Sequence, residues 1–240
     1  MKQIITEYQD GVLKLWGGKV KGFYLGGATP LTKFYFHHRE SLDLDFFTKE
    51  FDRQKPYVLR LIEKLSEDLG KNIELAGEET RKDRMKMLVF YVPLANQEVL
   101  KIDFVEDWLD LIKPLKNIDG INVLSLEDIY IRKIYTITGS LPAIDTVGRK
   151  VAIGKREEAK DFYDLYFLSH TFMELSRFAQ SYCDQTRKET IIRWFRSYDR
   201  MHIKTGLLDL KVKKDIDYNI MEKHFQREID KIIEGEVDFL

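Results

Sequence analysis

The sequence predicts an α+β protein, with a small mixed-sheet domain over residues 1–112 followed by a helical domain over residues 113–240. Two observations support this class. The first half contains short segments in which apolar and polar residues alternate, as in strands, with helical periodicity between them. The second half shows only helical spacing of its apolar residues from Ser125 onward, after the chain changes character at Pro114.

The expected elements of the first half follow in chain order. Residues 23–25 predict a strand that ends in a Gly-Gly turn, and residues 28–38 indicate a helix or helical turn. Residues 42–47 alternate apolar and acidic side chains, which predicts a half-buried strand. An amphipathic helix is predicted from Pro56 to Gly70, where the glycine ends it. Further strands are expected at 73–76, 87–92 and 99–105.

Helices are expected to dominate the second half. Ser125 provides an N-cap, with acidic residues in the first turn of the helix that follows. Residues 139–154 contain glycines and a proline among residues of mixed polarity, which predicts a loop. Further helices are expected at 157–168, 171–183, 187–204 and 218–234.

The amino-acid composition excludes several classes of protein. The 240 residues are 44% hydrophobic, which is enough to form a core and too much for disorder. Because 39 basic residues nearly balance 40 acidic ones, a bulk basic field for nucleic acid is excluded, although a local basic patch is not. The single cysteine, Cys183, excludes a disulfide framework and a cysteine-based zinc site. With no signal peptide and no apolar run of about 20 residues, we expect a soluble cytoplasmic protein with no membrane partner.

Two carboxylates on one strand suggest a metal site. In the segment 42–47, Asp43 and Asp45 share one face, while Leu44 and Phe46 share the other. Carboxylates roughly 7 Å apart along a strand repel each other unless a cation lies between them. Oxygen ligands suit Mg²⁺ or Mn²⁺. The alternative is an exposed pair that is simply solvated.

A third carboxylate strengthens the metal interpretation. The strand around 99–104 buries Leu100 and Ile102, and it turns Lys101 and Asp103 the other way. If this strand lies beside 42–47, Asp103 joins the first two acids. Three carboxylates on adjacent strands can hold two divalent ions, the arrangement used for in-line phosphoryl displacement.

A glycine turn upstream is a candidate phosphate site. In the turn Gly26-Gly27-Ala28-Thr29, backbone N–H groups can face an anion, and glycine permits its close approach. The Thr29 hydroxyl can bond to a phosphate oxygen. A glycine pair before a helix is also common in turns that bind no ligand, so this turn alone does not establish phosphate binding.

These motifs together resemble a known family. The segments Phe-Tyr-Leu-Gly-Gly-Ala-Thr-Pro-Leu at 23–31 and His-Arg-Glu-Ser-Leu-Asp-Leu-Asp-Phe-Phe at 38–47 are similar to the core of AbiEii-type nucleotidyltransferases. Those proteins are toxins of abortive-infection and toxin–antitoxin systems, built on the DNA-polymerase-β-like nucleotidyltransferase fold. With Thr29 matched to the family threonine, Ala28 stands where the second glycine belongs. A second register instead matches Gly26-Gly27 to the glycine pair and leaves Ala28 at the threonine position.

The resemblance continues to about residue 168. Residues 127–129, Lys133 and residues 160–166 resemble later family motifs, which implies that Lys133 and Asp161 complete the active site. Lys133 interrupts an apolar helical stripe, so it either extends outward to solvent or meets an anion. Asp161 lies on a helix that is apolar nearly all round and needs a partner. That partner could be a structural one among Arg132, Arg149 and Arg156, or Asp161 could orient Lys133.

The resemblance implies a metal-dependent enzyme that moves NMP from an NTP to an acceptor hydroxyl. In some relatives the acceptor is a tRNA 3′ end, and an antitoxin protein is the expected partner. Arg39 could bind phosphate or pin its loop to a carboxylate. The candidate catalytic residues are Asp43, Asp45, Asp103, Lys133 and Asp161, with the metal on the first three. The candidate nucleotide-binding residues are Gly26, Gly27, Thr29, Arg39, Ser41 and Lys133.

Two other functions remain open. The first is transfer to a protein or small-molecule hydroxyl, such as that of an antibiotic. The second is a catalytically silent nucleotide-binding module, which the alanine at position 28 favours. A basic ridge on the expected helix 187–204 is either a solvated face or a track for RNA phosphates; it consists of Arg193, Arg196, Arg200 and Lys204.

Overall fold

The computed structural model describes residues 2–80, 86–139, 141–144 and 150–237. Contacts divide the chain into two compact units. The first comprises Met1–Tyr35 and Ser41–Asp128, and the second comprises Phe36–Glu40 and Ile129–Leu240. A short piece of the N-terminal half therefore belongs with the C-terminal helices. A division into functional domains at residues 112 and 113 stays a prediction.

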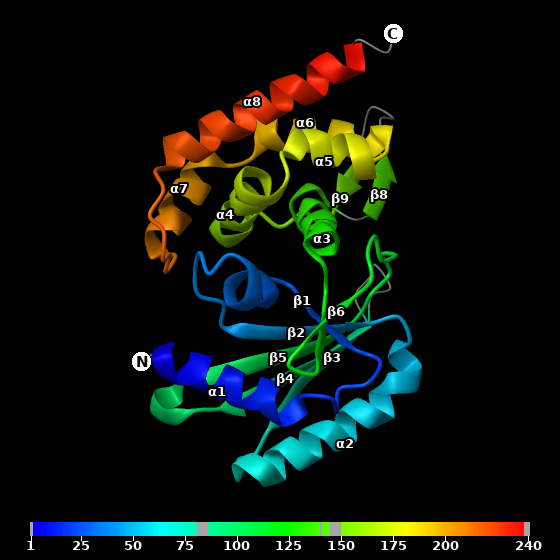
Figure 1. Ribbon diagram of the computed structural model, residues 1–240, viewed down its shortest axis with the longest axis vertical. Helices are drawn as coiled ribbons and strands as arrows, with labels where there is room; N and C mark the ends of the chain where they lie inside the picture. The colour runs from blue at the N-terminus through cyan, green and yellow to red at the C-terminus, as the bar shows by residue number, and fades with distance from the viewer. Residues whose placement is uncertain (1, 81–85, 140, 145–149, 238–240) are drawn as a thin grey trace. The chain divides into compact units, whose positions relative to one another are not determined.

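The first unit is built on a mixed sheet of seven strands (Figure 1). Its spatial order is β3-β4-β5-β2-β1-β7-β6, with β2 parallel to β5 and β1 parallel to β7. The other pairs are antiparallel. The strands are β1 (Tyr24–Gly26), β2 (Asp43–Thr48), β3 (Glu74–Thr80), β4 (Lys86–Pro93), β5 (Val99–Glu106), β6 (Lys116–Ile118) and β7 (Ile121–Val123).

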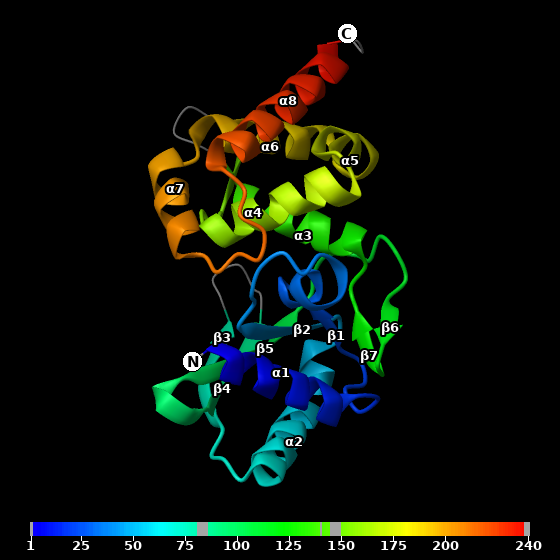
Figure 2. The same ribbon diagram turned by 60° about the vertical axis from the view of Figure 1, so that its left-hand side comes forward.

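Helices α1 (Lys2–Trp16) and α2 (Phe51–Leu69) pack against one face of this sheet (Figure 2). Trp16 of α1 contacts Phe46 and Phe104, with ring centroids 5.4 and 5.9 Å apart. Leu44 and Phe46 of β2 and Leu100, Ile102 and Phe104 of β5 point into this core. The opposite face carries the polar residues of the two strands together with Phe47 and Val105, which pack in a smaller apolar cluster with Met87 and Val89.

The helix predicted from Pro56 starts earlier than expected. It begins at Phe51, whose side chain is buried, so the packing of that ring sets the start and Pro56 lies inside the helix. The predicted end is confirmed, because Gly70 adopts a left-handed conformation with φ 59°. The helical turn expected at 28–38 is present but ends with the π-helical stretch Leu31–Tyr35, before His37 takes a positive φ.

The hairpin formed by β6 and β7 was not predicted. Its strands have three residues each, too few for a periodic pattern to be recognised. The available signal is the dipeptide Asp119-Gly120, whose two positive φ angles are those of a two-residue hairpin turn.

The second unit is mainly helical. The helices are α3 (Leu126–Thr138), whose first three residues belong to the first unit, α4 (Ala159–Phe167), the π-helical turn Leu168–Phe172, α5 (Leu175–Tyr182), α6 (Gln185–Ser197), α7 (Arg200–Asp209) and α8 (Tyr218–Val237). Ser125 caps α3 as predicted, since its hydroxyl accepts the backbone N–H of Asp128. Together the sheet and the helices confirm the predicted α+β class.

Two predictions about this unit were wrong. The helix expected at 187–204 is two helices, because the chain leaves helical geometry at Tyr198 and Asp199 caps α7. The basic ridge is thereby split between α6 and α7. Residues 139–154, expected as a loop, contain the antiparallel strands β8 (Leu141–Ile144) and β9 (Lys150–Ile153). Residues 140 and 145–149 of that segment lie outside the described residues.

Among the helices that the structure describes, none is long and apolar enough to cross a membrane.

Candidate active site

The predicted pairing of the two acidic strands is confirmed. β2 and β5 run parallel, and the register places Asp45 opposite Asp103 and Asp43 opposite Lys101. On the other face Phe46 stacks on Phe104, with centroids 5.4 Å apart. Since successive side chains of a strand alternate between faces, Asp45 and Asp103 share the face away from that core. Asp103 is nearly buried, at 5% exposure.

Gly27 brings the backbone of the glycine turn against Asp45. It has a φ of +65°, and a Cβ placed there would lie 2.1 Å from Asp45 Oδ2. Both the conformation and the close approach require glycine. Ala28 does not have a positive φ, so an alanine at this position introduces no backbone strain. Gly26 is buried between Phe47 and Leu124, where a Cβ would lie within 3 Å of both side chains.

Thr29 and Ser41 fix the start of β2. The Thr29 side chain is fully buried, and its hydroxyl donates to the backbone oxygen of Asp43. It also lies 3.1 Å from the Ser41 hydroxyl. Thr29 therefore acts on the strand that carries the carboxylates, and its role as a phosphate ligand stays a prediction.

The face of β2 and β5 that carries Asp43, Asp45 and Asp103, here called the carboxylate face, already contains one cation. This cation is the ammonium group of Lys101. Its Nζ lies 2.5 Å from Asp103 Oδ2. Burial acts to lower the pKa of Lys101, but the hydrogen bond to Asp103 and the charges of Asp103, Asp43 and Asp45 outweigh it and raise that pKa. All three carboxylates thus act on one positive charge.

The donor set fits a divalent cation in chemistry and charge, because three carboxylates on neighbouring strands supply hard oxygen ligands. The Lys101 ammonium pairs with Asp103 on the same face. Within the described ranges, no three His, Cys, Asp or Glu side chains are grouped closely enough to hold a metal on their own. A metal here would need side-chain adjustment or additional ligands from a substrate.

Lys133 is a buried cation in the second unit. Its ammonium group lies 2.7 Å from Asp161 Oδ1 and 2.6 Å from Asp164 Oδ2. Arg156 donates to both oxygens of Asp161, at 2.7 and 2.9 Å. Two of the alternatives left open by the sequence therefore coexist: Asp161 is paired with an arginine, and it orients Lys133. Burial acts to lower the pKa of Lys133, but the charges of both aspartates outweigh it and raise that pKa.

Asp164 also anchors the segment Phe36–Glu40. Arg39 binds it with two hydrogen bonds of 2.6 and 2.7 Å, and His38 Nε2 lies 2.9 Å from Oδ1. The backbone oxygen of His38 accepts a hydrogen bond from Lys213. Burial acts to raise the pKa of Asp164, but the charges of Lys133 and Arg39 hold it well below its ordinary value. Arg39 thus pins its loop to a carboxylate, and nucleotide binding by Arg39 stays a prediction.

The sequence did not single out His38 or Asp164 as site residues. Asp164 lies three residues after Asp161 on α4 and is fully buried, so a second acid on an apolar helix was the available signal. The first unit brings together the predicted residues Gly26, Gly27, Thr29, Ser41, Asp43, Asp45 and Asp103. The second unit holds the remaining predicted residues, Arg39, Lys133 and Asp161.

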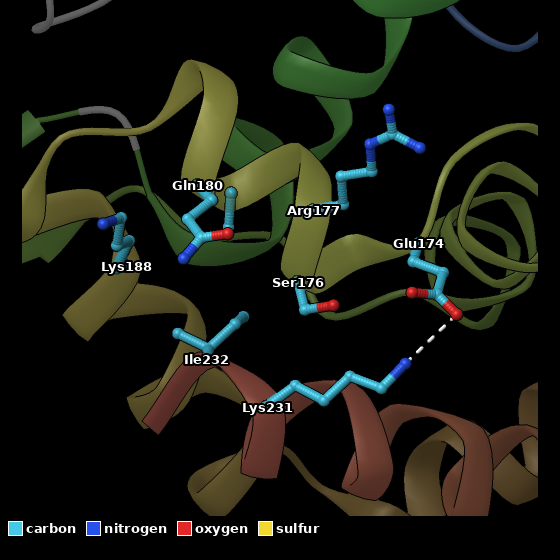
Figure 3. Close-up of a pocket in the computed structure, with 8 residues that line it drawn as sticks. Glu174, Ser176, Arg177, Gln180, Lys188, Lys231 and Ile232 are labelled. Carbon is cyan, nitrogen blue, oxygen red and sulfur yellow. Dashed lines mark ion pairs between the residues drawn. The ribbon is translucent and has the colours of Figure 1, made fainter. Parts of the chain in front are cut away.

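The second unit also contains a pocket of about 260 Å³ (Figure 3). Its lining comes from α5, α6 and α8, and Lys231 extends across it to Glu174, at 3.1 Å. The same ammonium group pairs with Glu228, at 2.9 Å. None of the predicted site residues lines this pocket, and its Lys231 is already neutralised by two carboxylates.

The model of one protein family, described as nucleotidyl transferase AbiEii toxin of type IV toxin–antitoxin systems, matches residues 17–239. Among curated proteins, no match is found.

Solved structures share the fold. JHP933 from Helicobacter pylori is similar over 100% of this chain and 97% of its own, with a TM-score of 0.57 and 15% identity. A candidate nucleotidyltransferase from H. pylori is similar over 98% of both chains, with a TM-score of 0.54 and 17% identity.

Proposed function

This chain belongs to the AbiEii family of nucleotidyl transferase toxins of type IV toxin–antitoxin systems, and on that premise we propose that it moves a nucleoside monophosphate from an NTP to an acceptor hydroxyl. The observation that carries the proposal is the register that pairs Asp45 with Asp103 on parallel strands, with Gly27 against Asp45. Acidic side chains beside a close-approach glycine suit a triphosphate bound with a cation.

The chain's own residues would divide the work as follows. Asp103 accepts the proton of the acceptor hydroxyl, whose oxygen bonds to the α-phosphorus while the bond to the bridging oxygen breaks and pyrophosphate leaves. The backbone at Gly27 seats the triphosphate. Mg²⁺ or Mn²⁺ held by Asp43, Asp45 and Asp103 would stabilise the charge that develops on the phosphate oxygens. Lys133 and Asp161, which the family resemblance assigns to the site, stay candidates.

RNA is the acceptor class that we favour, with a tRNA 3′ end as the specific proposal and the cytoplasm as the place of action. The family's role as a growth-arresting toxin supports an essential cellular acceptor, and it supports an antitoxin protein as partner. Since the net charge is −1, contact with RNA would depend on local basic groups. Arg193 and Arg196 on α6 are exposed and could contribute.

The test is transfer of label from each NTP into separate pools of tRNA, protein and aminoglycoside antibiotic. Three proteins are compared: wild type, Asp45→Asn, and Asp68→Asn, which removes an exposed carboxylate on α2. We expect label in tRNA with wild type and Asp68→Asn but not with Asp45→Asn. Label only in another pool would reject the RNA acceptor. Tight Mg²⁺–NTP binding without turnover in any pool would instead support the silent nucleotide-binding module.

A further inference from the structure

Helix α1 carries a polar residue in its buried face. The side chains of α1 that enter the core include Ile5, Val12, Leu13 and Trp16. Gln9 lies among them, at helical spacing from Ile5 and Val12, and is fully buried. The match to the AbiEii family starts at residue 17, directly after this helix, so the comparison assigns α1 no role.

The side-chain amide of Gln9 reaches Asp43, the first residue of strand β2. Its Nε2 donates to the backbone oxygen of Asp43, at 3.2 Å. The same oxygen accepts the hydroxyl of Thr29. A carbonyl oxygen has two lone pairs, so side-chain donors from two different elements fill both of them.

The hydrogen bond from Gln9 to Asp43 comes with a cost to the stability of the fold. Within the part of the chain that the structure describes, Gln9 Oε1 is buried and has no hydrogen-bond partner. A buried acceptor without a partner pays the desolvation penalty of that group, whereas an apolar side chain of similar size would carry no such cost. A costly residue in an otherwise apolar stripe points to a role in holding Asp43.

The next residue of α1 holds the other side of the turn. Asp10 pairs with Lys33, at 2.5 Å, and Lys33 lies in the π-helical stretch that follows the glycine turn. Consecutive residues of α1 therefore contact the start of β2 and the helical turn after Thr29, the second through an ion pair whose carboxylate is exposed.

We propose that Gln9 is a positioning residue of the nucleotidyl-transfer site, which holds the Asp43 backbone so that its carboxylate faces the bound cation and triphosphate. Helix α1 thereby forms part of the catalytic scaffold. The inference rests on the proposed function, because it assumes that Asp43 binds the cation that accompanies the nucleotide.

The test compares Mn²⁺ binding in the presence of a non-hydrolysable NTP analogue, which does not require turnover. Gln9→Met removes the amide and keeps the length of the side chain. We expect an unfolding midpoint equal to or above that of wild type, Mn²⁺ affinity lowered about tenfold, and a matching rise in the Mg²⁺ concentration for half-maximal transfer. Val12→Ala is the matched control, because it weakens the same face of α1 without removing a hydrogen bond to Asp43.

The outcomes separate the two proposals. Unchanged Mn²⁺ affinity and Mg²⁺ dependence in Gln9→Met would overturn the positioning role and leave the proposed function intact. Equal Mn²⁺ binding by wild type and Asp43→Asn would overturn both the positioning role and the assignment of Asp43 as a cation ligand, whereas the proposed transfer is tested separately by the labelling assay. Should Gln9→Met fail to fold, Gln9→Asn keeps the amide but shortens its reach, and the same loss of affinity is expected. The double variant with Thr29→Val should be non-additive, because both donors act on one carbonyl.

Discussion

The two units of the molecule differ in how many cations neutralise their clustered aspartates. On β2 and β5, three carboxylates share the positive charge of Lys101. In the second unit, Asp161 and Asp164 each bind two cations, drawn from Lys133, Arg39 and Arg156. The first arrangement gathers like charges around one ammonium group, and in the second each of the two carboxylates binds two cations.

We interpret this difference as one between a candidate ligand site in the first unit and a network that maintains the fold in the second. Neighbouring like charges destabilise a protein unless something bound supplies the opposite charge, so they occur where a ligand is expected. A compensated buried network holds elements together, and loss of one member leaves its partners unpaired. Removing a carboxylate should therefore affect activity in the first unit and stability in the second.

The largest expected effect is on stability, in Asp164→Asn. This change removes the charge that Arg39 and Lys133 bind in a fully buried position, so the free energy of unfolding should fall by about 3–5 kcal/mol. Urea denaturation followed by circular dichroism measures it. The control is Glu50→Gln, which breaks the exposed pair with Arg53 and should cost less than about 1 kcal/mol. Equal losses in the two variants would show that the network is not structural.

Asp103→Asn should instead lower activity strongly and stability only slightly. Transfer should slow by about 10²–10³-fold, because Asp103 is both the proposed general base and a proposed metal ligand. The free energy of unfolding should fall by less than in Asp164→Asn, since repulsion from Asp45 and attraction to the partly exposed Lys101 are lost together. Steady-state rates and urea denaturation of the same preparation test this. A stability loss as large as that of Asp164→Asn would remove the contrast between the units.

Gly27→Ala should cost more than the matched change Gly70→Ala. Both glycines have positive φ, so each alanine should cost about 1–2 kcal/mol of strain. Only at Gly27 does the added Cβ meet Asp45, and a further loss of about 1–3 kcal/mol is expected there, together with loss of transfer. Thermal denaturation and rate measurements compare the pair. Full activity in Gly27→Ala would mean that close approach at this turn is not needed.

The smallest expected effect is the pH dependence of stability that His38 contributes. Burial lowers the pKa of His38 below its ordinary value of 6.5, and the charges of Arg39 and Lys133 lower it further, against the opposing effect of Asp164. The unfolded chain therefore binds a proton more readily than the folded one. The stabilising effect is present above pH 6.5 and is lost as the pH falls toward the folded-state pKa, at up to about 1.4 kcal/mol per pH unit.

His38→Gln should reduce this slope below pH 6.5, by at most one proton, as measured by urea denaturation at several pH values. His224, which is also buried with a lowered pKa, should leave a residual slope in the variant. An unchanged slope in His38→Gln would assign the acid sensitivity to other groups.

The sequence predicted the carboxylate face because strand alternation is a local property. The apolar residues of 42–47 and 99–104 fix which side chains share a face, and a shared core then brings the two strands together. Strand alternation thus predicted that Asp103 joins Asp43 and Asp45 if the two strands are neighbours, and the structure adds the register that places Asp45 opposite Asp103.

Contacts between distant segments were beyond such reasoning. Arg39 and Asp164 are 125 residues apart, and no local pattern near Arg39 indicates a buried carboxylate partner. The break between α6 and α7 depends on Asp199 capping the second helix, while the helical periodicity continues through Tyr198. Gln9 was missed for a related reason. The role of one polar residue in an apolar stripe becomes clear only when its partner is known, and here the partner is the backbone oxygen of Asp43.

The most direct test of the central claim is anomalous diffraction from crystals grown with Mn²⁺ and a non-hydrolysable NTP analogue. We expect a manganese peak about 2.0–2.3 Å from oxygens of Asp43 and Asp45, with the Lys101 ammonium displaced from Asp103. A peak elsewhere, or bound nucleotide with no manganese at these carboxylates, would contradict the claim that this strand pair is the cation site.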